Sequence, residues 1–170
     1  CNDESFRLVR GEDICYDRYT IGISYSTWYH ARRVNTLLLP VLELLDQYNE
    51  DRQFIDVFDL GAGTGAVLWS LLLSKMALQE AGKDIPSIHI KMLDASPFML
   101  EYNHKYLMPI FFNKYPACKD TTVELTINSW VNDTGRGLIN PWIFASYVFD
   151  HNENYELVEE TFGTLVQNVR

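Results

Sequence analysis

The fold is decided by the stretch FIDVFDLGAGTGAVLWSLLLSKM, which runs from Phe54 to Met76. Its first part, residues 54–60, is short, mostly apolar and ended by a glycine, which predicts a buried strand. A glycine-rich turn at 61–65 follows, and residues 66–81 predict a helix that Gly82 ends. This order is typical of a nucleotide-binding unit, because glycines permit a tight turn and a helix N-terminus offers free N–H groups.

The rest of the chain alternates between runs of strand length and runs of helix length. Before the first strand, Gly22 predicts a break and Ser26 or Thr27 a helix cap, while Pro40 and Pro109 predict kinks inside their helices. The further elements expected are helices at 27–48, 96–115 and 154–169 and strands at 87–93, 122–130 and 142–149. Alternation of this kind predicts an α/β protein whose parallel sheet has helices on both faces.

Composition limits the classes of function. The 170 residues are 47% hydrophobic, which suits a globular core, and their formal net charge is −9. Phosphate contacts need clustered Lys and Arg, so this charge does not indicate direct nucleic-acid binding. No apolar run reaches the roughly 18 residues of a membrane span, and no secretory signal is visible. Cys1, Cys15 and Cys118 form no CxxC pair, so no metal site is expected and a reducing, cytoplasmic setting is favoured.

The glycine turn admits two functional interpretations. Read from Gly61 to Ala66, the residues GAGTGA match the pattern GxGxxA of dinucleotide-binding turns. Read from Asp59, the sequence is DxGxGxG, with a carboxylate at the end of the strand. That carboxylate would repel an anionic pyrophosphate and attract an ammonium group. Asp59 therefore favours a ligand with an amino-acid moiety rather than a dinucleotide.

The second expected strand also ends in a carboxylate. Asp94 follows the run KML and precedes the run ASPFMLE, in which Ser96 and Pro97 are a typical helix start. An acidic residue at the tip of the second strand can accept hydrogen bonds from both hydroxyls of a ribose. The sequence leaves open a second role, in which Asp94 only caps the following helix.

The stretches DLGAGTG (59–65) and LDASPFMLE (93–101) together resemble the first and second motifs of class I S-adenosylmethionine-dependent methyltransferases. The general likeness spans residues 54–165 and implies a Rossmann-like sheet with S-adenosyl-L-methionine as cofactor. A complete domain of this family has more strands than the four visible here. We therefore expect the fold to be truncated after the fourth strand and its helix, with missing chain or a partner beside that strand.

The resemblance also implies the roles of individual residues. Asp59 would attract the ammonium group, Asp94 would bind the ribose, and Trp130 would stack near the adenine. Ligands of such sheets bind outside the carboxyl ends of the strands, so residues at the carboxyl end of the fourth strand would face the acceptor. The expected catalytic residues are His151, as a general base, and Tyr147. The expected cofactor-binding residues are Asp59, Gly61, Ala62, Gly63, Gly65, Asp94, Ala95, Ser129, Trp130 and Ser146.

The predicted organisation is an N-terminal helical cover at 1–50 and a cofactor-binding core at 51–170. The segments ASYVFDH (145–151) and YSTWYHAR (25–32) are also loosely similar to a methyltransferase-like family linked to the mitochondrial small ribosomal subunit, which suggests ancestry rather than substrate. We expect methyl transfer to an unidentified acceptor by in-line displacement. Two alternatives stay open, namely an NAD(P)-binding Rossmann oxidoreductase and a non-catalytic assembly module with the methyltransferase fold.

Overall fold

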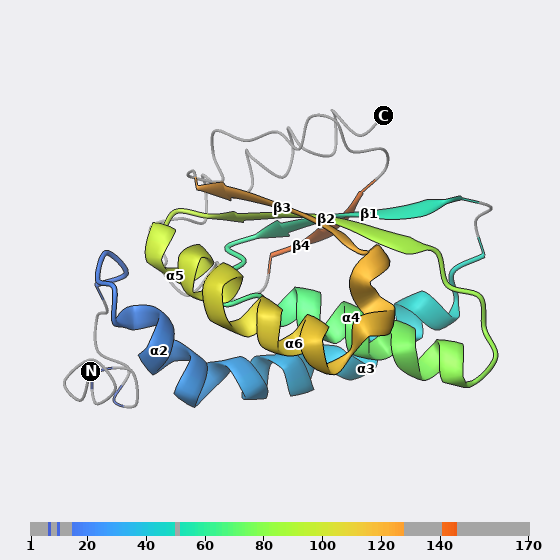
Figure 1. Ribbon diagram of the computed structural model, residues 1–170, viewed down its shortest axis with the longest axis horizontal. Helices are drawn as coiled ribbons and strands as arrows, with labels where there is room; N and C mark the ends of the chain where they lie inside the picture. Colours follow the sequence, from blue (N-terminus) through green and yellow to red (C-terminus); the bar gives the residue numbers. More distant parts are fainter. Residues whose placement is uncertain (1–6, 8–9, 11–14, 50–51, 128–140, 146–170) are drawn as a thin grey trace.

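The computed structural model describes residues 7, 10, 15–49, 52–127 and 141–145. Within these residues, four parallel strands form one sheet, and the helices lie on one of its faces (Figure 1). The predicted α/β class with a parallel sheet and flanking helices is confirmed. The helix expected at 154–169 lies outside the described residues.

The order of the strands reverses within the sheet. The strands are β1 (Phe54–Leu60), β2 (Ser87–Asp94), β3 (Thr122–Ile127) and β4 (Trp142–Phe144), and their order in the sheet is β3-β2-β1-β4. From β1 the chain moves outward to β2 and β3, and it then returns to pair β4 with the other side of β1. The order therefore reverses between β1 and β4, and ligands of open α/β sheets bind outside the carboxyl ends of the strands at such a point.

The predicted strands agree closely with β1 and β2 and less closely with β3 and β4. The predicted ends at 128–130 and 146–149 lie outside the described residues, and Ala145 is described but is not part of β4. In the part of the chain that the structure describes, β4 pairs with β1 alone.

The helical segments among the described residues follow here in chain order. They are α2 (Ile21–Tyr25), the π-helical turn η1 (Ser26–His30), α3 (Ala31–Asp46), α4 (Ala66–Glu80), α5 (Pro97–Tyr102), the π-helical turn η2 (Asn103–Leu107), α6 (Met108–Lys114) and the 3₁₀ turn η3 (Pro116–Asp120). The prediction for α4 is confirmed, including the left-handed Gly82 that follows it (φ 84°). Pro40 lies within the continuous helix α3, and Pro109 lies in the first turn of α6.

The start of the first helix was predicted wrongly. The helix that leads into α3 begins at Ile21, so Gly22 does not break it and neither Ser26 nor Thr27 caps it. Both hydroxyls instead donate to carbonyl oxygens one turn earlier, Ser26 to Gly22 (2.6 Å) and Thr27 to Ile23 (2.9 Å). Position 22 requires a glycine although it lies within a helix, because a Cβ there would lie 2.5 Å from the Cβ of Tyr102.

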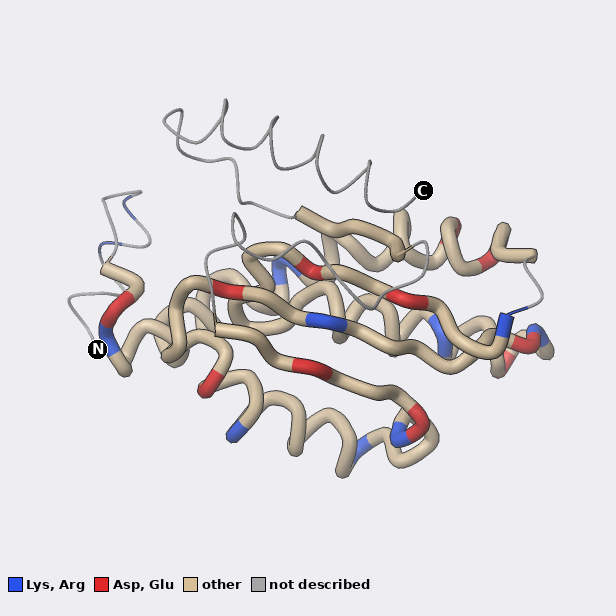
Figure 2. Tube along the Cα trace, turned by 90° about the horizontal axis from the view of Figure 1, so that it is seen from above, with Lys and Arg blue, Asp and Glu red and all other residues tan. Residues whose placement is uncertain are grey.

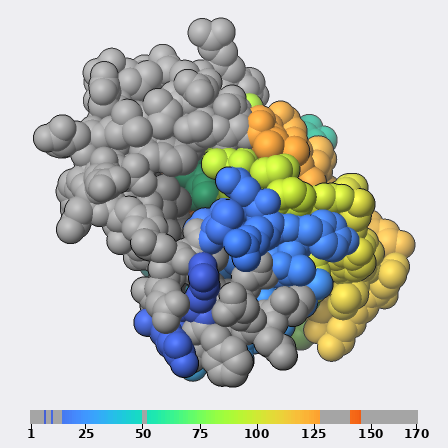
Figure 3. All heavy atoms as spheres, turned by 90° about the vertical axis from the view of Figure 1, so that its left-hand side faces the viewer, coloured from blue at the N-terminus to red at the C-terminus, as the bar shows by residue number. Residues whose placement is uncertain are grey.

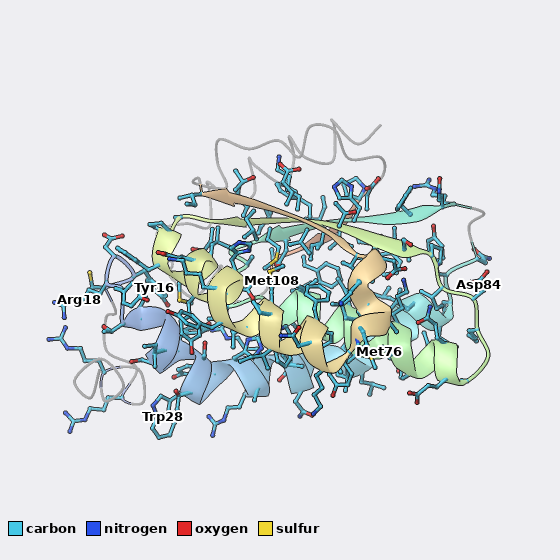
Figure 4. The ribbon with its side chains drawn as sticks, in the orientation of Figure 1. Tyr16, Arg18, Trp28, Met76, Asp84 and Met108 are labelled. Atoms are coloured by element: carbon cyan, nitrogen blue, oxygen red, sulfur yellow. The ribbon has the colours of Figure 1, made fainter. Side chains whose placement is uncertain are left out.

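The main hydrophobic core lies between the sheet and its helices, and the N-terminal helix α3 is part of it. Val41 and Leu45 of α3 are fully buried in the same cluster as Val57 of β1 and Leu72 of α4. Burial of each such side chain stabilises the fold by about 1.5–3 kcal/mol. Figure 4 shows Met76 and Met108 between the helices, at the edge of this core.

Small hydroxyl residues allow α3 and α4 to lie close together. Ser74 of α4 donates to the carbonyl oxygen of Leu38 on α3 (3.3 Å). One turn earlier, the hydroxyl of Ser70 shares its proton between the carbonyl oxygen of Ala66 in its own helix (2.8 Å) and that of Val34 on α3 (3.2 Å). These bonds satisfy two buried hydroxyls, and the two to α3 cross between segments that β1 separates in the sequence.

The other face of the sheet has an apolar part and an ionic part. Phe58, Leu60 and Leu93 form a buried cluster toward the carboxyl ends of the strands. Nearer the amino ends, Nδ1 of His89 lies 2.8 Å from a carboxylate oxygen of Asp56 on the neighbouring strand. Seen from above, acidic and basic positions are interspersed over the strands and helices, so the described chain presents no block of one charge (Figure 2).

Candidate functional site

The candidate site lies where the carboxyl ends of β1 and β2 meet the start of α4. Figure 3 views the molecule from this end and shows the atoms of the α2 region packed against those of the α5 region. Residues 61–65 of the glycine turn connect β1 to α4 at this edge. The glycine turn therefore lies at the same end of the molecule as the α2 and α5 regions.

Backbone hydrogen bonds fix the glycine turn. The N–H of Ala62 donates to the carbonyl of Leu93 on β2 (2.9 Å), and the N–H of Gly65 donates to the carbonyl of Ala62 (2.8 Å). The glycines adopt left-handed conformations, with φ of 66° at Gly61, 52° at Gly63 and 83° at Gly65. Gly65 precedes α4 and has no side chain that could cap the first N–H groups of the helix. The positive end of the helix dipole also faces the turn.

Asp94 joins the glycine turn to the start of α5. One carboxylate oxygen accepts from the N–H of Gly63 (2.7 Å) and the other from the N–H of Ser96 (2.8 Å). Burial raises the pKa of Asp94, and the two hydrogen bonds oppose that rise. Each carboxylate oxygen can accept a second hydrogen bond, so Asp94 can hold the turn and still bind a ligand hydroxyl.

Ser96 caps α5 as the sequence predicts, and it also contacts the N-terminal segment. Its hydroxyl oxygen accepts from the N–H of Met99 (3.4 Å), and the same hydroxyl donates to the carbonyl oxygen of Tyr16 (2.6 Å). Figure 4 shows Tyr16 at this end of the molecule, and its side chain is 40% exposed. The segment before α2 is therefore bonded to the start of α5, next to Asp94.

Asp59 is the most unusual residue of the site. It is fully buried, and neither carboxylate oxygen has a hydrogen-bond partner in the described part of the protein. Burial raises the pKa of Asp59 well above its ordinary value, and the charge of Asp94 raises it further. A buried carboxylate without a partner is strongly unfavourable, because nothing replaces the water that it loses.

The two carboxylates together define the chemistry that the site accepts. A ligand with a positive group near Asp59 would satisfy the unpaired oxygens and lower the cost of ionising that carboxyl. A pyrophosphate at the same turn would face both negative groups. The residues present therefore fit the ammonium and ribose parts of S-adenosylmethionine better than a dinucleotide.

The structure brings together some predicted site residues, while others lie outside the described part of the chain. Grouped at the edge are Asp59, Gly61, Ala62, Gly63, Gly65, Asp94 and the exposed Ala95. Outside the described residues are Ser129, Trp130, Ser146, Tyr147 and His151. The acceptor-side roles of Tyr147 and His151 stay predictions.

Sequence reasoning missed two buried polar residues that touch the turn. Nδ1 of His30 lies 3.0 Å from the hydroxyl oxygen of Thr64. The amide of Asn103 occupies the space beside Gly65, where a Cβ would meet its nitrogen at 2.6 Å. Asn103 belongs to no motif, and His30 stands in the segment YSTWYHAR without a role assigned to it. Each residue lies in a π-helical turn, which hydrophobic periodicity does not reveal.

Some site types find no support in the described residues. No group of three His, Cys, Asp or Glu side chains there is arranged to hold a metal ion. The search of the same residues for an apolar helix long enough to cross a bilayer found none.

We expect His30 to make the stability of the protein sensitive to mild acid. Burial lowers its pKa to about 4 from an ordinary 6.5, so the unfolded chain binds a proton between these values and the folded protein does not. The free energy of unfolding should therefore fall as the pH drops from 6.5 to about 4, by on the order of 3 kcal/mol. His30→Phe should remove this dependence in urea unfolding measured across the window. An unchanged pH profile in His30→Phe would contradict the assignment.

The comparisons with known proteins give structural likeness without sequence likeness. No protein-family model matches the chain, and no curated protein matches it. Among solved structures, the chain is similar to a putative S-adenosyl-L-methionine-dependent methyltransferase from Methanococcus maripaludis, with a TM-score of 0.53 and 14% identity. The match covers 91% of this chain and 61% of that protein, so this chain spans less than two thirds of its length.

A second solved structure is loganic acid methyltransferase with SAH, at a TM-score of 0.46 and 15% identity, covering 69% of this chain and 33% of that one. At these identities the likeness concerns the fold. The chain has the α/β, Rossmann-like architecture of the Methanococcus protein, a parallel sheet flanked by helices.

Proposed function

We propose that this chain binds S-adenosyl-L-methionine and transfers its methyl group to an acceptor, as a member of the class I methyltransferase superfamily. The observation that carries the proposal is Asp59, a fully buried carboxylate with two unpaired oxygens, two residues before the first glycine of the turn. The structural likeness to a putative methyltransferase supports the fold that this site requires.

The residues of the site divide the cofactor between them. Asp59 would neutralise the ammonium group of the methionine part, and the N–H groups at the start of α4 would face its carboxylate. Asp94 would accept hydrogen bonds from the ribose while it keeps its bond to Gly63. This arrangement uses the unpaired oxygens of Asp59, which a dinucleotide would leave unpaired.

The contribution of the chain to the reaction is to bind and to orient. S-adenosylmethionine supplies a methyl group on a sulfonium centre, which is already reactive toward nucleophiles. The glycine turn and Asp94 would hold the cofactor at the carboxyl edge of the sheet. Holding two reactants in line lowers the barrier mainly through orientation, so the site needs no strong acid or base among these residues.

Calorimetric titration of the protein with S-adenosylhomocysteine (SAH), S-adenosylmethionine and NAD tests the proposal. We expect SAH and S-adenosylmethionine to bind and NAD not to bind, because Asp59 and Asp94 oppose a pyrophosphate. A ligand at about 100 times its dissociation constant should also stabilise the fold by about 2.7 kcal/mol. Binding of NAD without binding of SAH would overturn the proposal in favour of a nucleotide-dependent oxidoreductase.

Catalysis is tested separately from binding. The protein and S-adenosylmethionine carrying a labelled methyl group are incubated with cell extract, and the label is followed into small molecules, protein and RNA. Label in one fraction would identify the acceptor class. Intact SAH binding without transfer to any fraction would favour the non-catalytic assembly module instead.

A further inference from the structure

Two π-helical turns contact consecutive residues of the glycine turn. His30 is the last residue of η1, and Asn103 is the first residue of η2. His30 meets Thr64, and Asn103 meets Gly65. One turn precedes β1 in the sequence and the other follows β2, so two distant segments contact the glycine turn. π-helical turns are rare and are frequently found at functional sites.

His30 reaches the turn through a buried hydrogen bond. The side chain is 6% exposed, and its ring packs edge-on against Trp69, with 4.9 Å between the ring centroids. Nδ1 bonds the hydroxyl of Thr64, which is itself 2% exposed, while Nε2 is buried without a partner. The neutral tautomer with its proton on Nδ1 costs least, because it leaves an unpaired nitrogen lone pair rather than an unpaired N–H donor.

Asn103 fills the other side of the turn. It is fully buried, its amide nitrogen lies 3.8 Å from the sulfur of Met92, and its amide oxygen is unpaired. A Cβ on Gly65 would lie within 3.0 Å of three atoms of this amide. The backbone of Gly65 therefore cannot move toward η2 without displacing the side chain of Asn103.

Packing stability alone does not account for these two residues. Each buries a polar atom without a hydrogen-bond partner, which costs about 1–3 kcal/mol. A phenylalanine at position 30 and a leucine at position 103 would fill nearly the same volumes without that cost. What His30 provides instead is a hydrogen bond directed at the turn, and Asn103 occupies the space beside Gly65.

We propose that His30 and Asn103 are positioning residues that hold Thr64 and Gly65 in the conformation that receives the ligand. The helices that carry them thereby become part of the binding site, although neither residue touches the ligand. Which ligand the turn receives rests on the proposed function, whereas the hold on the turn does not.

The first test needs no ligand. Amide hydrogen exchange is measured by NMR in wild type, His30→Phe, Thr64→Val and Asn103→Ala, at neutral pH where His30 is uncharged. We expect the amides of Gly63 and Gly65 to exchange about 2- to 12-fold faster in His30→Phe and Thr64→Val, the range that corresponds to one net hydrogen bond. They should also exchange faster in Asn103→Ala, which empties the space beside Gly65. The amides of Val57 and Ile90, in the centres of β1 and β2, serve as internal controls for global stability.

A substitution that keeps the hydrogen bond of His30 tests whether this bond, rather than the volume of the ring, holds the turn. Asparagine places an amide nitrogen where the histidine has Nδ1, so His30→Asn should return the exchange of Gly63 and Gly65 to within about 2-fold of wild type. His30→Phe keeps the ring and its contact with Trp69 and should not. Combining His30→Phe with Thr64→Val should add nothing to either single change, because both remove the same bond.

The second test measures SAH affinity in the same set. We expect His30→Phe and Thr64→Val to weaken SAH binding by about 2- to 12-fold, Asn103→Ala to weaken it as well, and His30→Asn to restore it. Unchanged exchange at Gly63 and Gly65 in all three variants would overturn the positioning role. The exchange measurement does not depend on the ligand. If the variants exchange faster than wild type but wild type does not bind SAH, the positioning role stands and only the proposed function is rejected.

Discussion

Asp59→Asn should weaken SAH binding at least about 100-fold and should at the same time increase the free energy of unfolding. The loss of affinity follows because an amide cannot neutralise the ammonium group, and removing one partner of a buried ion pair costs about 3–5 kcal/mol. The gain in stability follows because the unliganded protein buries the Asp59 carboxyl without a hydrogen-bond partner. At position 59, the carboxylate that favours ligand binding also lowers the stability of the unliganded fold.

The pH dependence of that stability gain has a definite sign. The pKa of Asp59 is raised in the folded protein, so above the ordinary carboxyl value the folded state holds a proton that the unfolded state has lost. Wild-type stability from this residue is therefore present at low pH and falls as the pH rises toward the raised pKa. The difference between Asp59→Asn and wild type should grow across this window.

Urea unfolding and SAH calorimetry on the same protein samples check both effects. Asp56→Asn is the matched control, since Asp56 lies on the same strand and is paired with His89 away from the glycine turn. It should leave SAH affinity unchanged. The assignment of Asp59 would be wrong if Asp59→Asn bound SAH as tightly as wild type, or if it were less stable than wild type at neutral pH.

Gly65→Ala should destabilise the fold by about 2–4 kcal/mol, through backbone strain and through overlap. The backbone has φ of +83°, which costs an alanine about 1 kcal/mol, and the new Cβ would lie 2.6 Å from the amide nitrogen of Asn103. Because Asn103 is fully buried, its side chain has no free space into which it could move. Denaturant unfolding measures the loss.

Gly82→Ala separates the two contributions. Gly82 has nearly the same backbone angle, φ of +84°, and a Cβ there would meet nothing within 4 Å. It should cost about 1 kcal/mol from strain alone. Combining Gly65→Ala with Asn103→Ala should recover part of the overlap energy. Equal losses for Gly65→Ala and Gly82→Ala would show that Asn103 does not restrict the turn.

The parts of the fold that local sequence determines could be predicted. Residues 54–60 are mostly apolar and a glycine follows them, so the predicted bounds of β1 match the structure. Gly82 marks the end of α4 because a left-handed residue is needed there. The start of α2 could not be predicted, because Gly22 is set by the approach of Tyr102, eighty residues later in the chain. Pro40 also lies within an unbroken α3, where packing against α4 outweighs the local preference.

The candidate site shows the same division. The sequence indicates Asp59 and Asp94 because both stand at strand ends, and parallel strands bring those ends together. It does not indicate that Asp59 lacks a partner, or that Asp94 bonds Gly63, since these depend on distances between elements. His30 was invisible as a site residue because a π-helical turn shifts the helical register by one residue.

The sharing of one core by α3 and the strands has an evolutionary consequence. Val41 and Leu45 are buried together with Val57 and Leu72, and the preceding turn brings His30 to Thr64. A recombination event that joined the N-terminal helices of one homologue to the sheet of another would have to match both the packing and the hydrogen bond at once. The two segments are therefore expected to be inherited as a pair, with positions 30 and 64 changing in step.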